Sequence, residues 1–161
     1  MPADTENHER PLLILGGTGT VGSRIAEQLA ASSVPALVAS RSGIGENGVV
    51  FDWHDRDTWG NPYEKADKGK IRAVYLIAPP SADAASAMME FVDFARELGT
   101  RRFVLQSASG IESGGPAMGK VHAYLRELGT RGEVEWAVLR PTWFQREDPI
   151  SRGVIVDCCC C

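Results

Sequence analysis

Cysteine is absent from the first 157 residues of this 161-residue chain, and all four cysteines occupy the last four positions. The body of the protein therefore has no disulfide framework, which we expect of a cytoplasmic protein. Long apolar runs are also missing, so the sequence predicts no membrane-spanning helix. The N-terminus is polar and acidic, and it lacks the basic and apolar regions of a secretory signal.

Basic residues are fewer than acidic ones, with 17 Lys+Arg against 21 Asp+Glu and a net charge of −4. This balance argues against a nucleic-acid partner bound through a basic surface. Apolar residues make up 43% of the chain and charged residues 24%, which are values of a globular protein and not of a disordered one. The length suits one domain and excludes a (β/α)₈ barrel of about 250 residues.

Short apolar runs alternate with segments of helical periodicity. The sequence predicts strands over residues 11–15, 36–39, 48–51, 71–78, 102–106 and 134–139. It predicts helices over 21–31, from a Ser81 cap with Asp83 in the first turn to about Leu98, and from Pro116 in the first turn to near Gly129. The polar segment 53–70 reads as a loop with one short helix. This alternation predicts an α/β fold, a Rossmann-like doubly wound parallel sheet of about six strands.

A glycine-rich loop separates the first predicted strand from the first predicted helix. Its residues fit both G-x-G-x-x-G and G-x-x-G-x-x-G, the two patterns sharing their last two glycines. Such a loop allows a tight turn and brings the backbone and the helix N-terminus close to a pyrophosphate. The loop predicts a dinucleotide site at Gly16, Gly17, Thr18, Gly19, Thr20, Val21 and Gly22. The alternative is a structural turn that binds nothing.

The residues after the second predicted strand discriminate between cofactors. NAD sites usually carry an acidic residue there, whereas this chain has Ser40, Arg41 and Ser42. Arg41 is suited to a 2′-phosphate, which the serines can also bind, so we expect NADP(H). In the alternative interpretation Arg41 is a solvated loop residue.

The next two strand ends supply further cofactor candidates. After the third strand, Asp52 can accept a hydrogen bond from the adenine amine and Trp53 can cover the ring, although Trp53 can equally be a packing residue. After the fourth strand, Ala78 and Pro79 are expected beside the cofactor, unless the proline merely ends the strand.

A catalytic acid is difficult to find. Carbonyl reduction by short-chain dehydrogenases uses a Tyr-x-x-x-Lys pair, and no tyrosine of this chain has that partner. Ser107, Lys120 and His122 are weak catalytic candidates, and Ser109 is a candidate on the substrate side. The alternative makes His122 a surface residue and Lys120 a solvated charge. Hydride addition to an iminium gives a neutral amine directly, so such a site needs no proton donor.

Several segments together carry a family resemblance. They are GGTGTVGSRIAEQL, VASRS, FDWHD, AVYLIAPP, RRFVLQSAS, GGPAMGKVHAYL and VEWAVLRPTWFQ. The chain resembles the NmrA-like atypical short-chain dehydrogenases, and more narrowly the fungal festuclavine/agroclavine dehydrogenase family of ergot alkaloid biosynthesis. The resemblance implies NADPH-dependent reduction of an iminium to a clavine-type amine, an alkaloid-like small-molecule substrate, and cofactor binding by Gly16, Gly19, Gly22 and Arg41. It places Thr142, Trp143 and Phe144 near the nicotinamide or the substrate.

The resemblance also divides the chain. It implies a flexible N-terminus over residues 1–10, an NAD(P)-binding Rossmann-like domain over 11–145, and an atypical tail over 146–161 that we expect to be disordered. Members of the family continue for about another hundred residues, so we expect a C-terminally truncated chain with an incomplete sheet. An altered reading frame, a retained intron or a truncated gene model would explain the cysteine-rich end, which has neither the spacing of a zinc site nor the basic neighbours of a lipidation site.

Two other functions stay open. The missing Tyr-x-x-x-Lys pair also suits a non-catalytic NADP-binding sensor or partner subunit of the NmrA-like kind. The unusual tail suits an inactive product, whose incomplete sheet would expose an edge strand.

Overall fold

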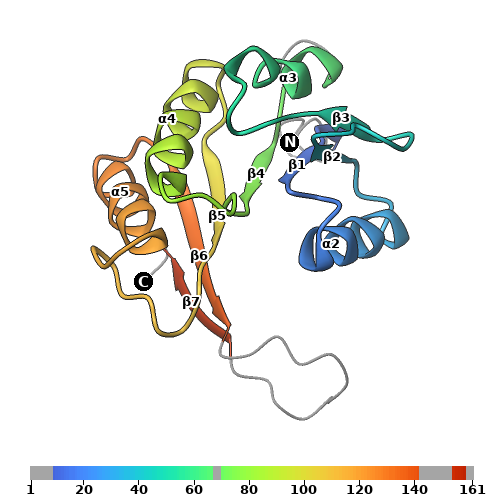
Figure 1. Cartoon of the computed structure of the whole chain (residues 1–161). Coiled ribbons are helices and arrows are strands. Elements are labelled where there is room, and N and C mark those ends of the chain that lie inside the picture. The colour runs from blue at the N-terminus through green and yellow to red at the C-terminus, as the bar shows by residue number, and fades with distance from the viewer. Residues whose placement is uncertain (1–8, 67–69, 142–153, 159–161) are drawn as a thin grey trace, which may run out of the picture.

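The computed structural model describes residues 9–66 and 70–141, and the backbone alone of residues 154–158. Strands and helices alternate along the chain (Figure 1). The strands are β1 (Leu12–Leu15), β2 (Ala36–Ser40), β3 (Gly48–Val50), β4 (Ala73–Leu76), β5 (Arg102–Gln106), β6 (Glu135–Pro141) and β7 (Val154–Cys158). The helices are α2 (Thr20–Ala31), the 3₁₀ turn η1 (Arg56–Thr58), α3 (Asn61–Lys65), α4 (Ala84–Glu97) and α5 (Met118–Thr130).

All these strands form one sheet in the order β3-β2-β1-β4-β5-β6-β7. The pairings from β3 to β6 are parallel, so six strands run in one direction. The chain leaves β1 toward β2 on one side and returns to β4 on the other, which makes the carboxyl ends of β1 and β4 the switch point of the sheet. The predicted Rossmann-like parallel sheet is confirmed.

The expected disorder of the tail is wrong for residues 154–158. These residues form β7, which pairs antiparallel with β6 from Val154 opposite Pro141 to Cys158 opposite Ala137. The physical reason is that β6 would otherwise leave its backbone N–H and C=O groups unpaired at the edge, and a β-branched segment such as Val154–Val156 suits an added strand. Residues 146–153 and 159–161 lie outside the described residues, as do 1–8 of the expected N-terminal segment.

The two halves of the sheet are covered differently. In β1 three of the four residues are buried, because both faces of the sheet are covered there. Helix α2 lies on one face, and α3 and α4 lie on the other (Figure 1). In β4, β5 and β6 buried residues alternate with half-buried or exposed ones, and the buried face packs against α4 and α5. Val74, Phe103 and Val138 are essentially inaccessible on that face.

Two predicted helix starts need correction. α4 has Asp83 and not Ser81 as its N-cap, without a side-chain capping bond, because the turn after the two prolines continues two residues further. α5 begins at Met118, so Pro116 precedes the helix instead of occupying its first turn. Ala117 has a φ of 49°, and this left-handed residue separates Pro116 from the helix. The segment 53–70 contains two short elements, η1 and α3, where one was predicted.

Candidate functional site

A cleft of about 390 Å³ opens at the carboxyl ends of β1, β2, β3 and β4, at the switch point of the sheet. Its wall contains most of the predicted cofactor residues: Gly16, Thr18, Gly19, Arg41, Asp52, Trp53, Ala78 and Pro79. The other lining residues are Ala39, Ser40, Phe51, His54, Ile77 and Pro80. The four strand ends that the sequence predicted as one site therefore do meet. Gly17, Thr20, Val21 and Gly22 lie behind or beside the wall and do not line the cleft.

The glycine turn is shaped by two close constraints. Gly16 has a φ of +72°, a left-handed conformation that side chains disfavour, and the turn is closed by the N–H of Gly19, which donates to Gly16 O at 3.0 Å. A Cβ on Gly22 would lie 2.5 Å from Gly16 O and 2.6 Å from Gly17 Cα, both backbone atoms. The first glycine makes the turn and the last lets α2 pack on it.

The N-terminus of α2 is suited to an anion. Gly19 is the N-cap and has no side chain to bond the first amides, and the first turn carries no acidic residue. The first N–H groups of a helix have no partner within the helix and carry the positive end of its dipole. Because Thr18 and Gly19 line the cleft, this uncapped helix start lies at its edge.

The end of β2 places a cation in the same cleft. Arg41 lines it and is exposed, whereas Ser40 is 8% exposed. The Ser40 hydroxyl accepts the N–H of Gly43 at 3.1 Å and lies 3.4 Å from the Ser42 hydroxyl. The loop that carries Arg41 is thus held by its neighbours while the guanidinium is accessible to a ligand.

The end of β3 supplies the opposite wall. Asp52 Oδ1 accepts the N–H of His54 at 2.9 Å, which engages one of the two carboxylate oxygens. Trp53 lies edge-to-face with Phe51 and Phe91, at ring-centroid distances of 5.1 and 5.6 Å. The Trp53 ring therefore packs on the aromatic core and also lines the cleft, while its contact with an adenine ring stays a prediction.

The predicted catalytic candidates do not line the cleft. Lys120 is exposed on α5, in keeping with a solvated charge. His122 is 5% exposed, and its ring centroid lies 5.5 Å from that of Trp136 in β6, so the interpretation of His122 as a surface residue is wrong. The reason is helical spacing: Met118, His122 and Leu125 share the face of α5 that packs on the sheet.

The loop after β5 holds the two serines beside β6. Ser107 is 7% exposed and its N–H donates to Leu139 O at 2.9 Å, while Ser109 N–H donates to Pro141 O at 3.1 Å. Arg140 donates to Ser109 O at 2.8 Å and to Glu112 Oε1 at 2.5 Å. Thr142, Trp143 and Phe144, which the resemblance places near the substrate, lie outside the described residues.

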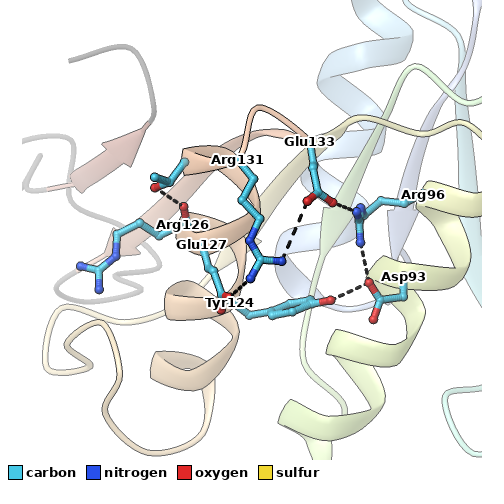
Figure 2. Close-up of polar contacts among 8 residues, drawn as sticks. Asp93, Arg96, Tyr124, Arg126, Glu127, Arg131 and Glu133 are labelled. Atoms are coloured by element: carbon cyan, nitrogen blue, oxygen red, sulfur yellow. Dashed lines mark hydrogen bonds and ion pairs between the residues drawn. The ribbon is translucent and has the colours of Figure 1, made fainter.

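None of the three tyrosines is placed as a proton donor. Tyr63 shares a hydrogen bond of 3.1 Å with Thr100, and burial raises its pKa to about 12. Tyr75 donates to Gln106 Oε1 at 3.2 Å, and burial raises its pKa. Tyr124 donates to Asp93 Oδ1 at 2.5 Å, and burial together with that carboxylate raises its pKa to about 12 (Figure 2). A general acid needs a pKa nearer neutrality and access to the substrate.

Sequence reasoning missed Ala39, His54 and Ile77 as cleft residues. Each of them directly neighbours a predicted site residue. Their position at a strand end could therefore have identified them, whereas their residue types could not. Among the described residues no group of three or more His, Cys, Asp or Glu side chains is placed to hold a metal ion. Within the same ranges no helix combines the length and apolarity needed to cross a bilayer.

Comparison with known proteins agrees with this geometry. The family described as NAD(P)H-binding matches residues 16–157. Festuclavine synthase II of Penicillium roqueforti is 48% identical over 147 residues, an alignment that covers 86% of this chain and 50% of the relative. Agroclavine dehydrogenase of Claviceps purpurea is 44% identical over 149 residues, covering 89% and 50%. These relatives confirm the resemblance read from the sequence, and the chain spans about half of their length.

A solved structure supports the fold alone. The UDP-glucose 4-epimerase of Thermus thermophilus, in complex with NAD, superposes with a TM-score of 0.61 at 19% identity. The match covers 86% of this chain and 58% of the epimerase. The shared part is the Rossmann-like sheet with its helices.

Proposed function

Because this chain belongs to the NAD(P)H-binding family, we propose that residues 11–145 are the NADPH-binding domain of a reductase that transfers a hydride to an iminium and yields a clavine-type amine. One observation carries the cofactor proposal. The uncapped start of α2, the Gly16 turn and the Arg41 guanidinium border one cleft at the switch point of the sheet.

Each wall of the cleft has a role in binding. The first amides of α2, with Gly19 at the cap, bind the pyrophosphate. Arg41 pairs with the 2′-phosphate, since a guanidinium matches a phosphate in geometry and charge. Asp52 accepts a hydrogen bond from the adenine amine and Trp53 covers the ring. Ala78 and Pro79 border the side nearest β4.

The reaction class rests on what the tyrosines do. When bound, the cofactor supplies a hydride from its reduced nicotinamide. Ketone reduction would then require a proton donor, whereas an iminium accepts the hydride and becomes a neutral amine. All three tyrosine hydroxyls are hydrogen-bonded elsewhere and have raised pKa values, which supports the iminium. Ser109, Thr142, Trp143 and Phe144 are proposed on the substrate side.

The same tyrosine observation supports a second candidate function, an NADP-binding sensor or partner subunit without turnover. The two candidates share the cleft and differ in whether bound NADPH is consumed. Incubation with a clavine-type iminium separates them: loss of nicotinamide fluorescence with amine formation supports the reductase, and stable NADPH supports the sensor.

The cofactor proposal is tested by titrating the chain with NADPH and NADH and following nicotinamide fluorescence. We expect tighter binding of NADPH, by about tenfold to a hundredfold, because a charge-assisted phosphate contact is present only there. Arg41→Ala is expected to remove the preference without weakening NADH. Arg126→Ala, which changes an exposed arginine of α5 outside the cleft, is the matched control. Equal affinity for both cofactors in the unsubstituted chain would overturn the assignment of Arg41.

A further inference from the structure

The wall of the cleft after β3 is held by residues that do not line it. Asp52 N–H donates to the Thr58 hydroxyl oxygen at 2.8 Å, and Asp52 O accepts the indole N–H of Trp59 at 3.1 Å. Asp52 O also accepts the N–H of Asp55 at 3.2 Å. Both polar groups of the Asp52 backbone are therefore bonded to the segment 55–59, and neither Thr58 nor Trp59 borders the cleft.

The Thr58 hydroxyl bonds to the backbone of both Asp52 and Asp55. Besides accepting from Asp52, it lies 2.6 Å from Asp55 O and 3.2 Å from Asp52 O, so its single proton has an acceptor on the same turn. Asp55 in turn caps η1, with its carboxylate accepting the N–H of Asp57 at 3.2 Å. A change at position 58 is thus transmitted directly to the backbone that carries the Asp52 carboxylate.

An aromatic cluster forms the base of the same wall. Trp59 is 4% exposed and stacks on Phe51 at a ring-centroid distance of 6.5 Å and an interplanar angle of 18°. Both rings contact Phe91 of α4 edge-on, at 5.5 and 5.3 Å. Phe91 is fully buried and Trp59 nearly so, so Trp59 presents its N–H to Asp52 from within a close-packed core.

We propose that Thr58 and Trp59 are positioning residues for the adenine end of the cofactor: by bonding the Asp52 backbone they hold its carboxylate where it accepts from the exocyclic amine. This inference rests on the proposed NADPH site. Under this inference, two residues that do not line the cleft determine how strongly the site prefers adenine over a base without the exocyclic amine.

The experiment compares NADPH with its hypoxanthine analogue, in which oxygen replaces the exocyclic amine. The unsubstituted chain is expected to bind NADPH more tightly, because the analogue offers the carboxylate an acceptor in place of a donor. Thr58→Val removes the hydroxyl with little change of shape. It is expected to weaken NADPH binding about tenfold and to change the affinity for the analogue by less than about twofold. The ratio of the two dissociation constants should then approach one.

Three further variants make the result specific. Thr58→Ser keeps the hydroxyl and should restore the ratio. Trp59→Phe removes the second bond to Asp52 while keeping a ring in the cluster, so it should lower the ratio even if Thr58→Val does not fold. Thr100→Val removes a buried threonine hydroxyl that bonds Tyr63 outside the cleft, so it should lower stability and leave the ratio unchanged.

Two results would overturn the inference while leaving the proposed NADPH binding and hydride transfer intact. The first is a chain that binds NADPH and its analogue equally. The second is a Thr58→Val variant that weakens both ligands by the same factor, which is the signature of a general structural role. A chain that binds neither NADPH nor NADH would instead refute the proposed function and this inference with it.

Discussion

The two halves of the sheet use their polar groups in different ways. Around β1, β2 and β3 the structure leaves groups available to a ligand: the uncapped amides of α2, the Arg41 guanidinium and the wall at Asp52. Around α4, α5 and β6 several charged and phenolic side chains bond one another. Figure 2 shows Tyr124 and Arg96 meeting Asp93, with Arg96 also paired to Glu133 and Arg131 to Glu127. The first half is built for binding, and the second half is stabilised by its own contacts.

In the part of the chain that the structure describes, none of the predicted catalytic side chains beside β5 and β6 lines the cleft. The second half uses its phenol, its buried histidine and its buried arginine within the fold. The contrast between the halves leads to predictions that differ in size, beginning with the largest effect.

The largest effect is expected from Gly22→Ala, in the first half. The added Cβ would meet Gly16 O and Gly17 Cα, which are backbone atoms of the turn and cannot rotate away. We expect the free energy of unfolding to fall by about 3 kcal/mol and dinucleotide binding to be lost. Urea unfolding and NADPH titration measure the two effects.

Gly110→Ala is the control for that substitution, because no heavy atom lies within 4 Å of its added Cβ and its φ is not left-handed. It should change stability by less than about 0.5 kcal/mol. Normal NADPH binding by Gly22→Ala would show that the turn does not form the site.

Gly129→Ala is the counterpart in the second half. Its Cβ would meet the indole ring of Trp136, a side chain that packs against His122. We expect a loss of about 2 kcal/mol from overpacking, without any change in the affinity for NADPH. Weakened NADPH binding in this variant would mean that the two halves are coupled, and it would contradict the assignment of binding to the first half alone.

Alkaline pH should weaken the fold through two phenols. Burial raises the pKa of Tyr63 and of Tyr124 to about 12 from an ordinary value of 10.0. Their stabilising effect is therefore fully present below pH 10 and is lost as the pH rises through 12, because the unfolded chain releases these protons first. Urea unfolding across this range should show falling stability.

Tyr124→Phe measures how much the second half contributes to this pH dependence of stability. Without the hydroxyl, the bond to Asp93 is lost and stability near neutrality should fall by about 1 kcal/mol. The loss on raising the pH should also become smaller than in the unsubstituted chain. An unchanged pH profile would contradict the raised pKa of Tyr124.

The smallest effect is expected from Glu112→Gln. Glu112 pairs with Arg140 at 2.5 Å; the Arg140 side chain is buried, but that of Glu112 is 78% exposed, so water screens the carboxylate, and glutamine keeps an oxygen that can accept from Arg140. We expect a loss of less than about 1 kcal/mol and an unchanged affinity for NADPH. A larger loss would show that the loop after β5 depends on this pair.

Much of the first half could be predicted from the sequence because its determinants are local. The glycine turn lies within seven consecutive residues, and the strand ends at Arg41, Asp52 and Ala78 follow short apolar runs directly. Parallel strands bring such ends to one edge, so position along the chain is enough to predict that they meet. The seventh strand was missed, because its pairing with β6 depends on a free sheet edge and not on a local pattern.

Local sequence patterns were enough to predict the order of the elements, the Rossmann-like sheet and the location of the cleft, since hydrophobic periodicity and turn chemistry act over a few residues. Three contacts could not be predicted in this way: His122 packs on Trp136, Tyr124 donates to Asp93, and the Thr58 hydroxyl accepts from the Asp52 N–H. The first two are contacts between separate elements, and the third closes a turn whose geometry depends on the aromatic cluster beneath it. Which side chains are committed to the fold, and which are left for a ligand, follows from packing across the whole core.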